Sequence, residues 1–164
     1  MTSRPLDVWV VDDDQSVRWV LEKALKQADM EPRSFERAEH LLEALDNSPP
    51  DVLITDVRMP GMSGIALLER LRTTCPALPV IVITAFGSLE AAVKAIRAGA
   101  YDFVAKPIDM DILALTIERA IQHRALQEKV KLLSEAVEQS QRMEELLGAS
   151  RPMKALFDQL ERIA

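Results

Sequence analysis

The sequence predicts an α/β fold, a doubly wound five-stranded parallel sheet followed by a long C-terminal coiled-coil helix. Three observations lead to this fold class. Short apolar runs alternate five times with stretches of helical periodicity. Turn-forming or acidic residues follow the apolar runs, as at Pro60-Gly61. The last helical pattern continues far beyond the fifth apolar run. Such alternation is typical of a parallel sheet with helices on both faces and right-handed crossovers.

Each element is assigned from its hydrophobic period and its flanking residues. The predicted strands are 7–11, 30–35, 51–55, 80–84 and 101–105, and the predicted helices are 16–27, 38–45, 65–73, 89–97 and 112–147. The run 80–84 is the most apolar and is expected in the middle of the sheet, whereas 30–35 is poorly apolar and is expected nearer an edge. Gly99 is expected to cap the fourth helix, and Asp109 or Asp111 the last one. The architecture expected from this order of elements is flavodoxin-like.

The composition indicates one domain with an appendage, in 164 residues that are 48% apolar and 28% charged. Trp9 and Trp19 are expected in its core. Cys75 is the only cysteine, which excludes an internal disulfide and favours a reducing compartment. No signal peptide is apparent, and no apolar stretch approaches the roughly 20 residues of a membrane span. We therefore expect a cytoplasmic protein without membrane contact, and the net charge of −6 argues against nucleic-acid binding by the chain as a whole.

The long last helix carries a pattern that predicts dimerisation. Residues 112–147 contain neither proline nor glycine. Leu126, Val130, Leu133 and Val137 follow one another at spacings of four, three and four residues, which is the core spacing of a coiled coil. Ser140 and Glu144 occupy the next two core positions before Leu147, so the pattern weakens there. We expect a homodimer through this helix; the alternative is a single amphipathic helix folded back on the domain.

Polar side chains follow four of the five predicted strands. They are Asp12, Asp13 and Asp14 after the first strand, Asp56 at the end of the third, Thr84 at the end of the fourth and Lys106 after the fifth. The carboxyl ends of parallel strands share one edge of the sheet, and ligands of open α/β sheets bind outside that edge. These side chains are therefore expected to form one site.

The chemistry of this set favours a metal ion and a phosphoryl group. Converging carboxylates raise one another's pKa, and a hard divalent cation such as Mg²⁺ relieves that repulsion. Lys106 can act as a point charge on a phosphoryl oxygen, and the Thr84 hydroxyl can donate to another. Asp56 is then a candidate nucleophile that forms an aspartyl phosphate. Asp14 is equally suited to capping the first helix.

The segments VVDDD, DVRMPGMSG, VIVITA and YDFVAKP occur in this order, and together they resemble the receiver domain of two-component response regulators over residues 6–123. The resemblance implies that Asp56 accepts a phosphoryl group from a sensor histidine kinase. It also implies a Mg²⁺ site in which Asp13 and Asp56 are direct ligands and Asp12 acts through water. The backbone carbonyl of Arg58 would complete that site.

The same resemblance implies a conformational switch. Thr84 matches the switch hydroxyl, Lys106 the lysine that pairs with the phosphate, and the Lys106–Pro107 bond is expected to be cis. Phe103 matches the switch aromatic. Many members of the family have tyrosine there, so a mechanism that requires a phenolic hydroxyl does not carry over to this chain.

Two longer segments, WVVDDDQSVRWVLEKAL and VRMPGMSGIALLERL, are similar to the nitrogen-regulation subgroup, and LLGASRPMKALFDQLERIA is similar to the opening of the AAA+ domain of sigma-54-dependent activators. The expected domains are a receiver at 1–123, a coiled-coil linker helix at 124–147 and the start of a truncated AAA+ domain at 148–164. The sequence lacks the Walker pattern G-x-x-x-x-G-K-[ST], so we expect no enzyme activity. Contacts with DNA and sigma-54 polymerase would belong to absent domains. Phosphorylation would switch the dimer and so control the attached ATPase, either by releasing it or by building its active oligomer.

Two other functions compete with a phosphorylated receiver. A phosphatase of the haloacid-dehalogenase type would use Asp12 as nucleophile and Asp14 as acid, but it needs a late acidic pair after a strand. Tyr101-Asp102-Phe103 lies within a predicted strand and supplies no such pair. A degenerate receiver acting only as a dimerisation scaffold is the other alternative, and a failure to bind Mg²⁺ would favour it.

Overall fold

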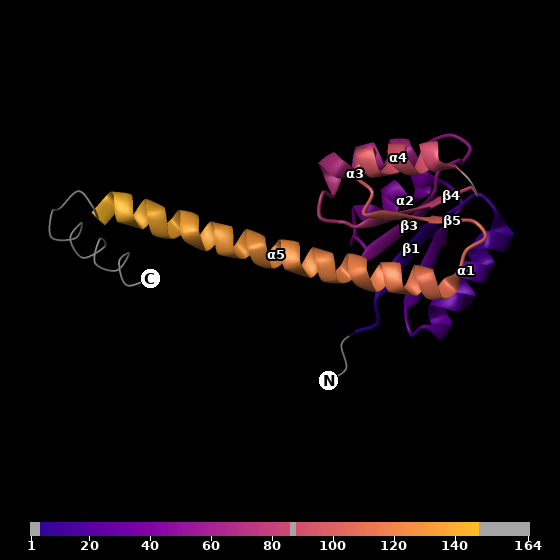
Figure 1. Cartoon of the computed structure of the whole chain (residues 1–164), viewed down its shortest axis with the longest axis horizontal. Helices are drawn as coiled ribbons and strands as arrows, with labels where there is room; N and C mark the ends of the chain where they lie inside the picture. The colour runs from indigo at the N-terminus through magenta and orange to yellow at the C-terminus, as the bar shows by residue number, and fades with distance from the viewer. Residues whose placement is uncertain (1–3, 86–87, 148–164) are drawn as a thin grey trace. The chain divides into compact units, whose positions relative to one another are not determined.

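The computed structural model describes residues 4–85 and 88–147 and confirms the predicted α/β class (Figure 1). Five parallel strands form one sheet in the order β2-β1-β3-β4-β5. The strands are β1 (Asp7–Val11), β2 (Glu31–Phe35), β3 (Val52–Asp56), β4 (Val80–Thr84) and β5 (Asp102–Ala105). As predicted, β4 is interior and β2 is an edge strand. Every residue of β3 and β4 is buried, which explains why their sequences are almost continuously apolar.

Helices cover both faces of the sheet. They are α1 (Gln15–Gln27), α2 (Ala38–Leu45), α3 (Gly64–Thr74), α4 (Leu89–Ala98) and α5 (Met110–Leu147). Buried side chains of α2, α3 and α4 pack with one set of strand residues, including Leu53 and Val82. Buried side chains of α1 and of the first turns of α5 pack with the alternate set, including Ile54 and Ile83. Because successive strand residues point to opposite faces, β1, β3 and β4 each contribute to both cores.

Side-chain caps set the helix boundaries. The Asp14 carboxylate accepts the backbone N–H of Ser16 and begins α1, so this carboxylate serves as a cap. Asp109 accepts the N–H of Asp111 at 2.9 Å, and α5 consequently begins at Met110, two residues before the predicted start. Gly99 ends α4 with a φ of +112°, which confirms the predicted glycine cap.

The two tryptophans differ in burial. Trp9 is buried as predicted, and its ring centroid lies 5.1 Å from that of Phe35. The prediction for Trp19 was wrong, because its side chain is 60% exposed. Helix α1 buries a single stripe, formed by Leu21 and Leu25, and Trp19 lies off that stripe. The Trp19 ring instead lies 5.0 Å from the ammonium group of Lys23.

The chain divides into two compact units, Met1–Arg124 and Ala125–Ala164. In the second unit the structure describes residues 125–147, all of which are helical. The predicted start of an AAA+ domain at 148–164 lies outside the described residues. Within the described ranges, no helix is both long enough and apolar enough to cross a membrane.

Candidate functional site

The parallel register brings the predicted polar residues to one edge of the sheet. Val11 pairs with Thr55, so the two strands end together at Asp12 and Asp56. Thr84 pairs with Ala105, which places Lys106 just beyond the end of β4. Strands β1 and β4 are the two neighbours of β3, so the side chains that follow these strands surround Asp56.

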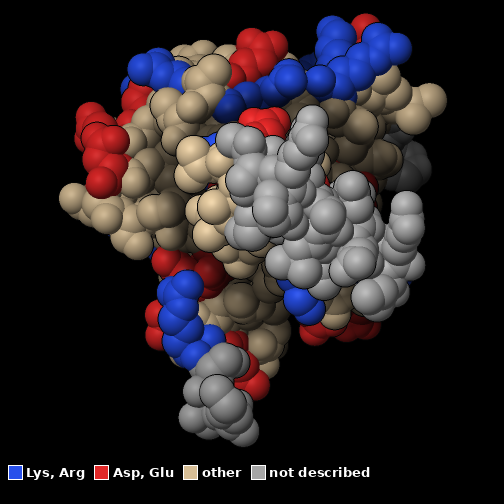
Figure 2. Space-filling model, turned by 90° about the vertical axis from the view of Figure 1, so that its left-hand side faces the viewer, with Lys and Arg blue, Asp and Glu red and all other residues tan. Residues whose placement is uncertain are grey.

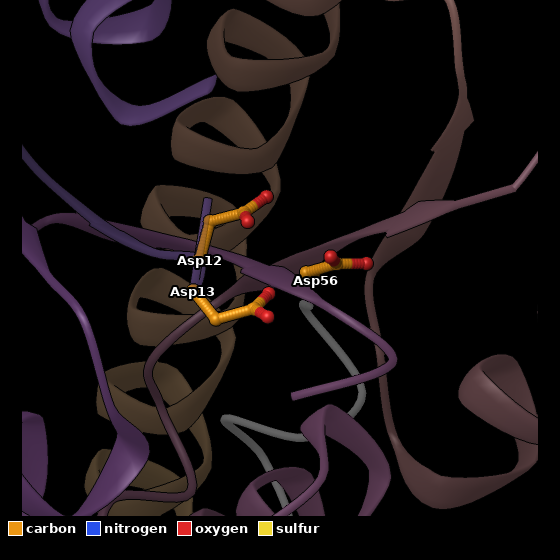
Figure 3. A group of neighbouring side chains, drawn as sticks. All are labelled: Asp12, Asp13 and Asp56. Atoms are coloured by element: carbon orange, nitrogen blue, oxygen red, sulfur yellow. The ribbon is translucent and has the colours of Figure 1, made fainter. Parts of the chain in front are cut away.

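Three carboxylates meet at this edge. Asp12 and Asp56 are buried and Asp13 is exposed, and one oxygen from each lies within 4.8 Å of the other two. In Figure 3 the side chains of Asp12 and Asp13, which are adjacent in the chain, both extend toward the side on which Asp56 lies. Oxygens bound to one Mg²⁺ each lie about 2.0–2.1 Å from the ion, so they stand at most about 4 Å apart. A small inward movement of these carboxylates would produce such a site.

Lys106 provides positive charge to the cluster. Its Nζ lies 3.3 Å from Oδ2 of Asp56 and 4.0 Å from Oδ2 of Asp12. The Lys106–Pro107 bond is cis, as the resemblance implied. One ammonium group compensates only part of the charge of three carboxylates, so the cluster retains an excess of negative charge that a divalent cation would balance.

Asp12 carries the clearest sign of a missing partner. Its Oδ1 accepts the backbone N–H of Asp14 at 2.9 Å, whereas its buried Oδ2 has no hydrogen-bond partner in the described part of the chain. Burial raises the pKa of Asp12 to about 6; the hydrogen bond from Asp14 opposes this shift, and repulsion from Asp56 adds to it. A buried oxygen with no donor is typical of a group that faces a bound ion or a water held by that ion, so the residues present fit a hard cation.

The substitution Asp12→Asn should therefore stabilise the metal-free protein at pH 7.5. The raised pKa means that the ionised side chain is less favourable in the folded chain than in the unfolded chain above pH 6. Removing that charge should raise the free energy of unfolding by about 1–2 kcal/mol in urea titrations with EDTA. We expect Mg²⁺ to stabilise the parent protein further and to have little effect on this variant.

Asp13→Asn is the matched control for that substitution. Asp13 is also within the cluster but is exposed, so its replacement should weaken the response to Mg²⁺ and leave the metal-free stability nearly unchanged. A loss of metal-free stability in Asp12→Asn would contradict our account of the buried oxygen.

The structure also reveals neighbours of the site that the sequence analysis missed. Arg18 on α1 donates from Nη1 to the backbone carbonyl of Asp12 at 2.6 Å. Glu39 on α2 accepts the N–H of Met62 and so holds the loop after Asp56. Gly64 begins α3 directly against the backbone of Asp56. Arg18 and Glu39 gave no signal in the sequence, because helical surface positions with these residue types are common.

The remaining predicted residues lie as follows. Thr84 is buried at the end of β4, beside the cluster. Phe103 lies on β5 and pairs with Val82 of β4, which precedes Thr84 by two residues. The Phe103 side chain is 39% exposed. Arg58 follows β3 and is exposed. The structure therefore places Thr84 at the site edge and Phe103 on the edge strand.

Comparison with known proteins identifies this arrangement. Residues 8–118 match the family described as response regulator receiver domain. The chain belongs to the response regulator receiver family. The receiver sequence is 52% identical over 116 residues to the DNA-binding transcriptional regulator NtrC of Escherichia coli strain K12, which covers 71% of this chain and 25% of that protein. The whole chain is 35% identical over 164 residues to the C4-dicarboxylate transport transcriptional regulatory protein DctD of Rhizobium meliloti, covering 100% of this chain and 35% of that protein.

Solved structures give the same result for the receiver. The receiver domain of NtrX from Brucella abortus superposes with a TM-score of 0.68 at 37% identity, covering 71% of this chain and 98% of that one. A longer NtrX structure from the same organism has a TM-score of 0.74 at 36% identity and covers 79% of this chain and 29% of that one. The chain spans about a quarter to a third of the length of the curated relatives it matches.

Proposed function

We propose that this receiver accepts a phosphoryl group on Asp56 from a sensor histidine kinase. The observation that carries the proposal is the position of the Asp56 carboxylate. It lies at the carboxyl end of a central strand, 3.3 Å from the Lys106 ammonium group and within a cluster of three carboxylates. A carboxylate at the mouth of a sheet, next to a fixed cation, can act as a nucleophile toward an electron-poor phosphorus.

In the proposed reaction, an Oδ atom of Asp56 attacks the phosphorus of the kinase phosphohistidine. The new O–P bond forms as the P–N bond breaks, and the electron pair of that bond stays on the imidazole nitrogen. Lys106 pairs with a phosphoryl oxygen, and the Thr84 hydroxyl donates a hydrogen bond to another. The product is an acyl phosphate on Asp56.

The acidic cluster would hold the metal ion that this reaction uses. Asp13, Asp56 and the backbone carbonyl of Arg58 would be direct ligands of Mg²⁺, and Asp12 would act through water. When bound, Mg²⁺ neutralises charge on the phosphoryl oxygens. The unpartnered Oδ2 of Asp12 and the excess of negative charge both support this assignment.

We further propose that phosphorylation switches a homodimer formed through the long helix. Thr84 would move toward the phosphoryl group, and Phe103, partly exposed in this structure, would turn into the space it leaves. The exposed side chains of Leu126, Val130 and Leu133 support pairing of two copies along α5.

The wider role we propose is the regulatory part of a sigma-54-dependent transcription activator. Residues 1–123 would be the receiver and 124–147 the linker coil. Residues 148–164 would begin an AAA+ domain whose larger part lies outside this chain. Figure 2 shows a row of Lys and Arg side chains along the upper part of the face in view, with acidic side chains beside it. The net charge of −6 of the chain as a whole supports DNA contact through other domains.

The test is to locate the phosphoryl group chemically. The protein is incubated with Mg²⁺ and a small acyl phosphate, and the product is analysed by intact mass and by peptide mapping after borohydride reduction of the aspartyl phosphate. We expect one phosphoryl group, on Asp56, and none in the Asp56→Asn variant or in the presence of EDTA.

Asp111→Asn is the control, because Asp111 is exposed in the first turn of α5 and lies outside the cluster. That variant should be phosphorylated like the parent. Label on Asp12 would point instead to the phosphatase alternative, and no label in any variant would support a degenerate receiver.

A further inference from the structure

The described part of the second unit consists of the helical segment 125–147, on which large apolar side chains are exposed. They are Leu126 (61%), Val130 (61%), Leu132 (66%), Leu133 (64%), Val137 (55%), Met143 (61%) and Leu146 (77%). These side chains form more than one stripe, and a coiled coil can bury only one stripe at a given level of the helix. The inference below rests on the proposed homodimer and concerns which side chains its core contains.

The N-terminal part of the segment has the pattern of a two-stranded parallel coiled coil. Leu126 and Leu133 occupy d positions, and Val130 and Val137 occupy a positions. In parallel coiled coils, valine at a with leucine at d favours two strands. The flanking e and g positions are Gln127, Lys129, Ser134 and Ala136. Parallel pairing therefore brings no like charges together beside the core, and a second copy of this chain is the occupant that fits.

Continuing the same register creates a conflict further along. Glu144 would take the next a position, so two carboxylates would face each other across the dimer core. Burying like charges without a cation is strongly unfavourable. The nearest arginine, Arg142, lies 3.7 Å from Glu138 and forms an ion pair with it on the outer side of the helix. Reversing one helix separates the two carboxylates, but an antiparallel pair centred on Val137 would bury each Glu144 unpaired against Val130.

A second register removes the carboxylates from the core. Ala136, Ser140, Met143 and Leu147 are separated by four, three and four residues, which is again the spacing of a coiled-coil core. Joining this set to Leu126, Val130 and Leu133 produces two consecutive intervals of three residues, from Val130 to Leu133 and from Leu133 to Ala136. Such a three-residue insertion is a stammer, and it overwinds the coil locally.

We propose that two copies pair in parallel along 126–147 and that their shared core changes register through a stammer between Leu133 and Ser140. Met143 then lies in the core, and Glu144 lies at its solvent-exposed border. Neighbouring helix positions differ by about 100° in direction, so Met143 and Glu144 cannot both be central. The two residues therefore distinguish the registers.

Disulfide cross-linking of the whole chain tests this proposal. Cys75 is replaced by serine, and single cysteines are introduced by Leu133→Cys, Met143→Cys, Glu144→Cys or Glu135→Cys. Leu133 is central in both registers and Glu135 in neither. We expect rapid oxidation to a covalent dimer for Leu133→Cys and Met143→Cys. Oxidation should be at least about tenfold slower for Glu144→Cys and Glu135→Cys, because a disulfide requires Cβ atoms about 3.5–4.5 Å apart.

The dimer dissociation constant, measured by sedimentation, is an independent readout. Met143→Ser should raise it about tenfold, since an apolar core side chain is lost, whereas Glu144→Ser should change it less than about threefold. Rapid cross-linking at 144 with slow cross-linking at 143, or tighter dimerisation of Glu144→Ser, would overturn the stammer in favour of the continuous register.

Failure of the homodimer itself has a different signature. A parent protein that sediments as a monomer at every concentration, with or without phosphorylation, would remove both the dimer and its register. The transfer of a phosphoryl group to Asp56 would still be testable by mass. A dimeric parent in which Leu133→Cys does not cross-link would overturn the proposed pairing and leave a dimer formed by another surface.

Discussion

Gly64→Ala should destabilise the receiver severely and prevent phosphorylation of Asp56. A Cβ atom on Gly64 would stand 2.1 Å from the backbone oxygen of Asp56 and 3.1 Å from Cα of Val57. Both neighbours are main-chain atoms of the strand end that carries the nucleophile, so no side-chain rotation relieves the clash. The N–H of Gly64 also donates to the carbonyl of Val57 at 2.9 Å, which holds α3 in place.

The expected loss in free energy of unfolding for Gly64→Ala is on the order of 3 kcal/mol, measured by urea titration. Ser63→Ala is the matched control. It removes the cap that accepts the N–H of Ala66 at the start of the same helix, without adding an atom near Asp56, and should cost about 1 kcal/mol. A Gly64→Ala protein within about 1 kcal/mol of the parent would show that α3 can move away from the strand end.

Lys106→Met should slow phosphorylation of Asp56 by a small acyl phosphate at least about tenfold, and on the order of a hundredfold if Lys106 contacts the phosphoryl group in the transition state. The ammonium group lies 3.3 Å from the Asp56 carboxylate and 4.0 Å from the Asp12 carboxylate, so it forms ion pairs with two members of the cluster. Methionine keeps the aliphatic stem and removes the charge. The rate is followed by intact mass at fixed Mg²⁺.

Two further variants test whether the effect of Lys106→Met comes from loss of the charge at this position. Lys106→Arg should recover part of the rate, because the charge returns in a different shape. Lys94→Met removes a lysine whose side chain is 66% exposed and lies 3.7 Å from Glu90, and it should leave the rate unchanged. Phosphorylation of Lys106→Met at the parent rate would mean that the ammonium group serves only to neutralise the resting carboxylates.

The sequence by itself determined the class of the fold and the composition of the candidate site. Apolar runs as continuous as 80–84 require burial on both faces, and their alternation with helical patterns leaves a parallel sheet as the simple solution. In such a sheet every strand ends at the same edge. Asp12, Asp56, Thr84 and Lys106 could therefore be grouped before any distance was known.

Only the tertiary structure decided how that group is arranged. Strand order placed β3 between β1 and β4, which made Asp56 the centre of the cluster. The missing partner of the Asp12 Oδ2 atom and the contact between Gly64 and the Asp56 carbonyl depend on packing between segments distant in sequence. The exposure of Trp19 likewise follows from which stripe of α1 meets the sheet. Local sequence patterns specify which side chains share an edge or a face. Distances between side chains, and polar atoms left without a hydrogen-bond partner, are determined only by the packing of the helices on the sheet.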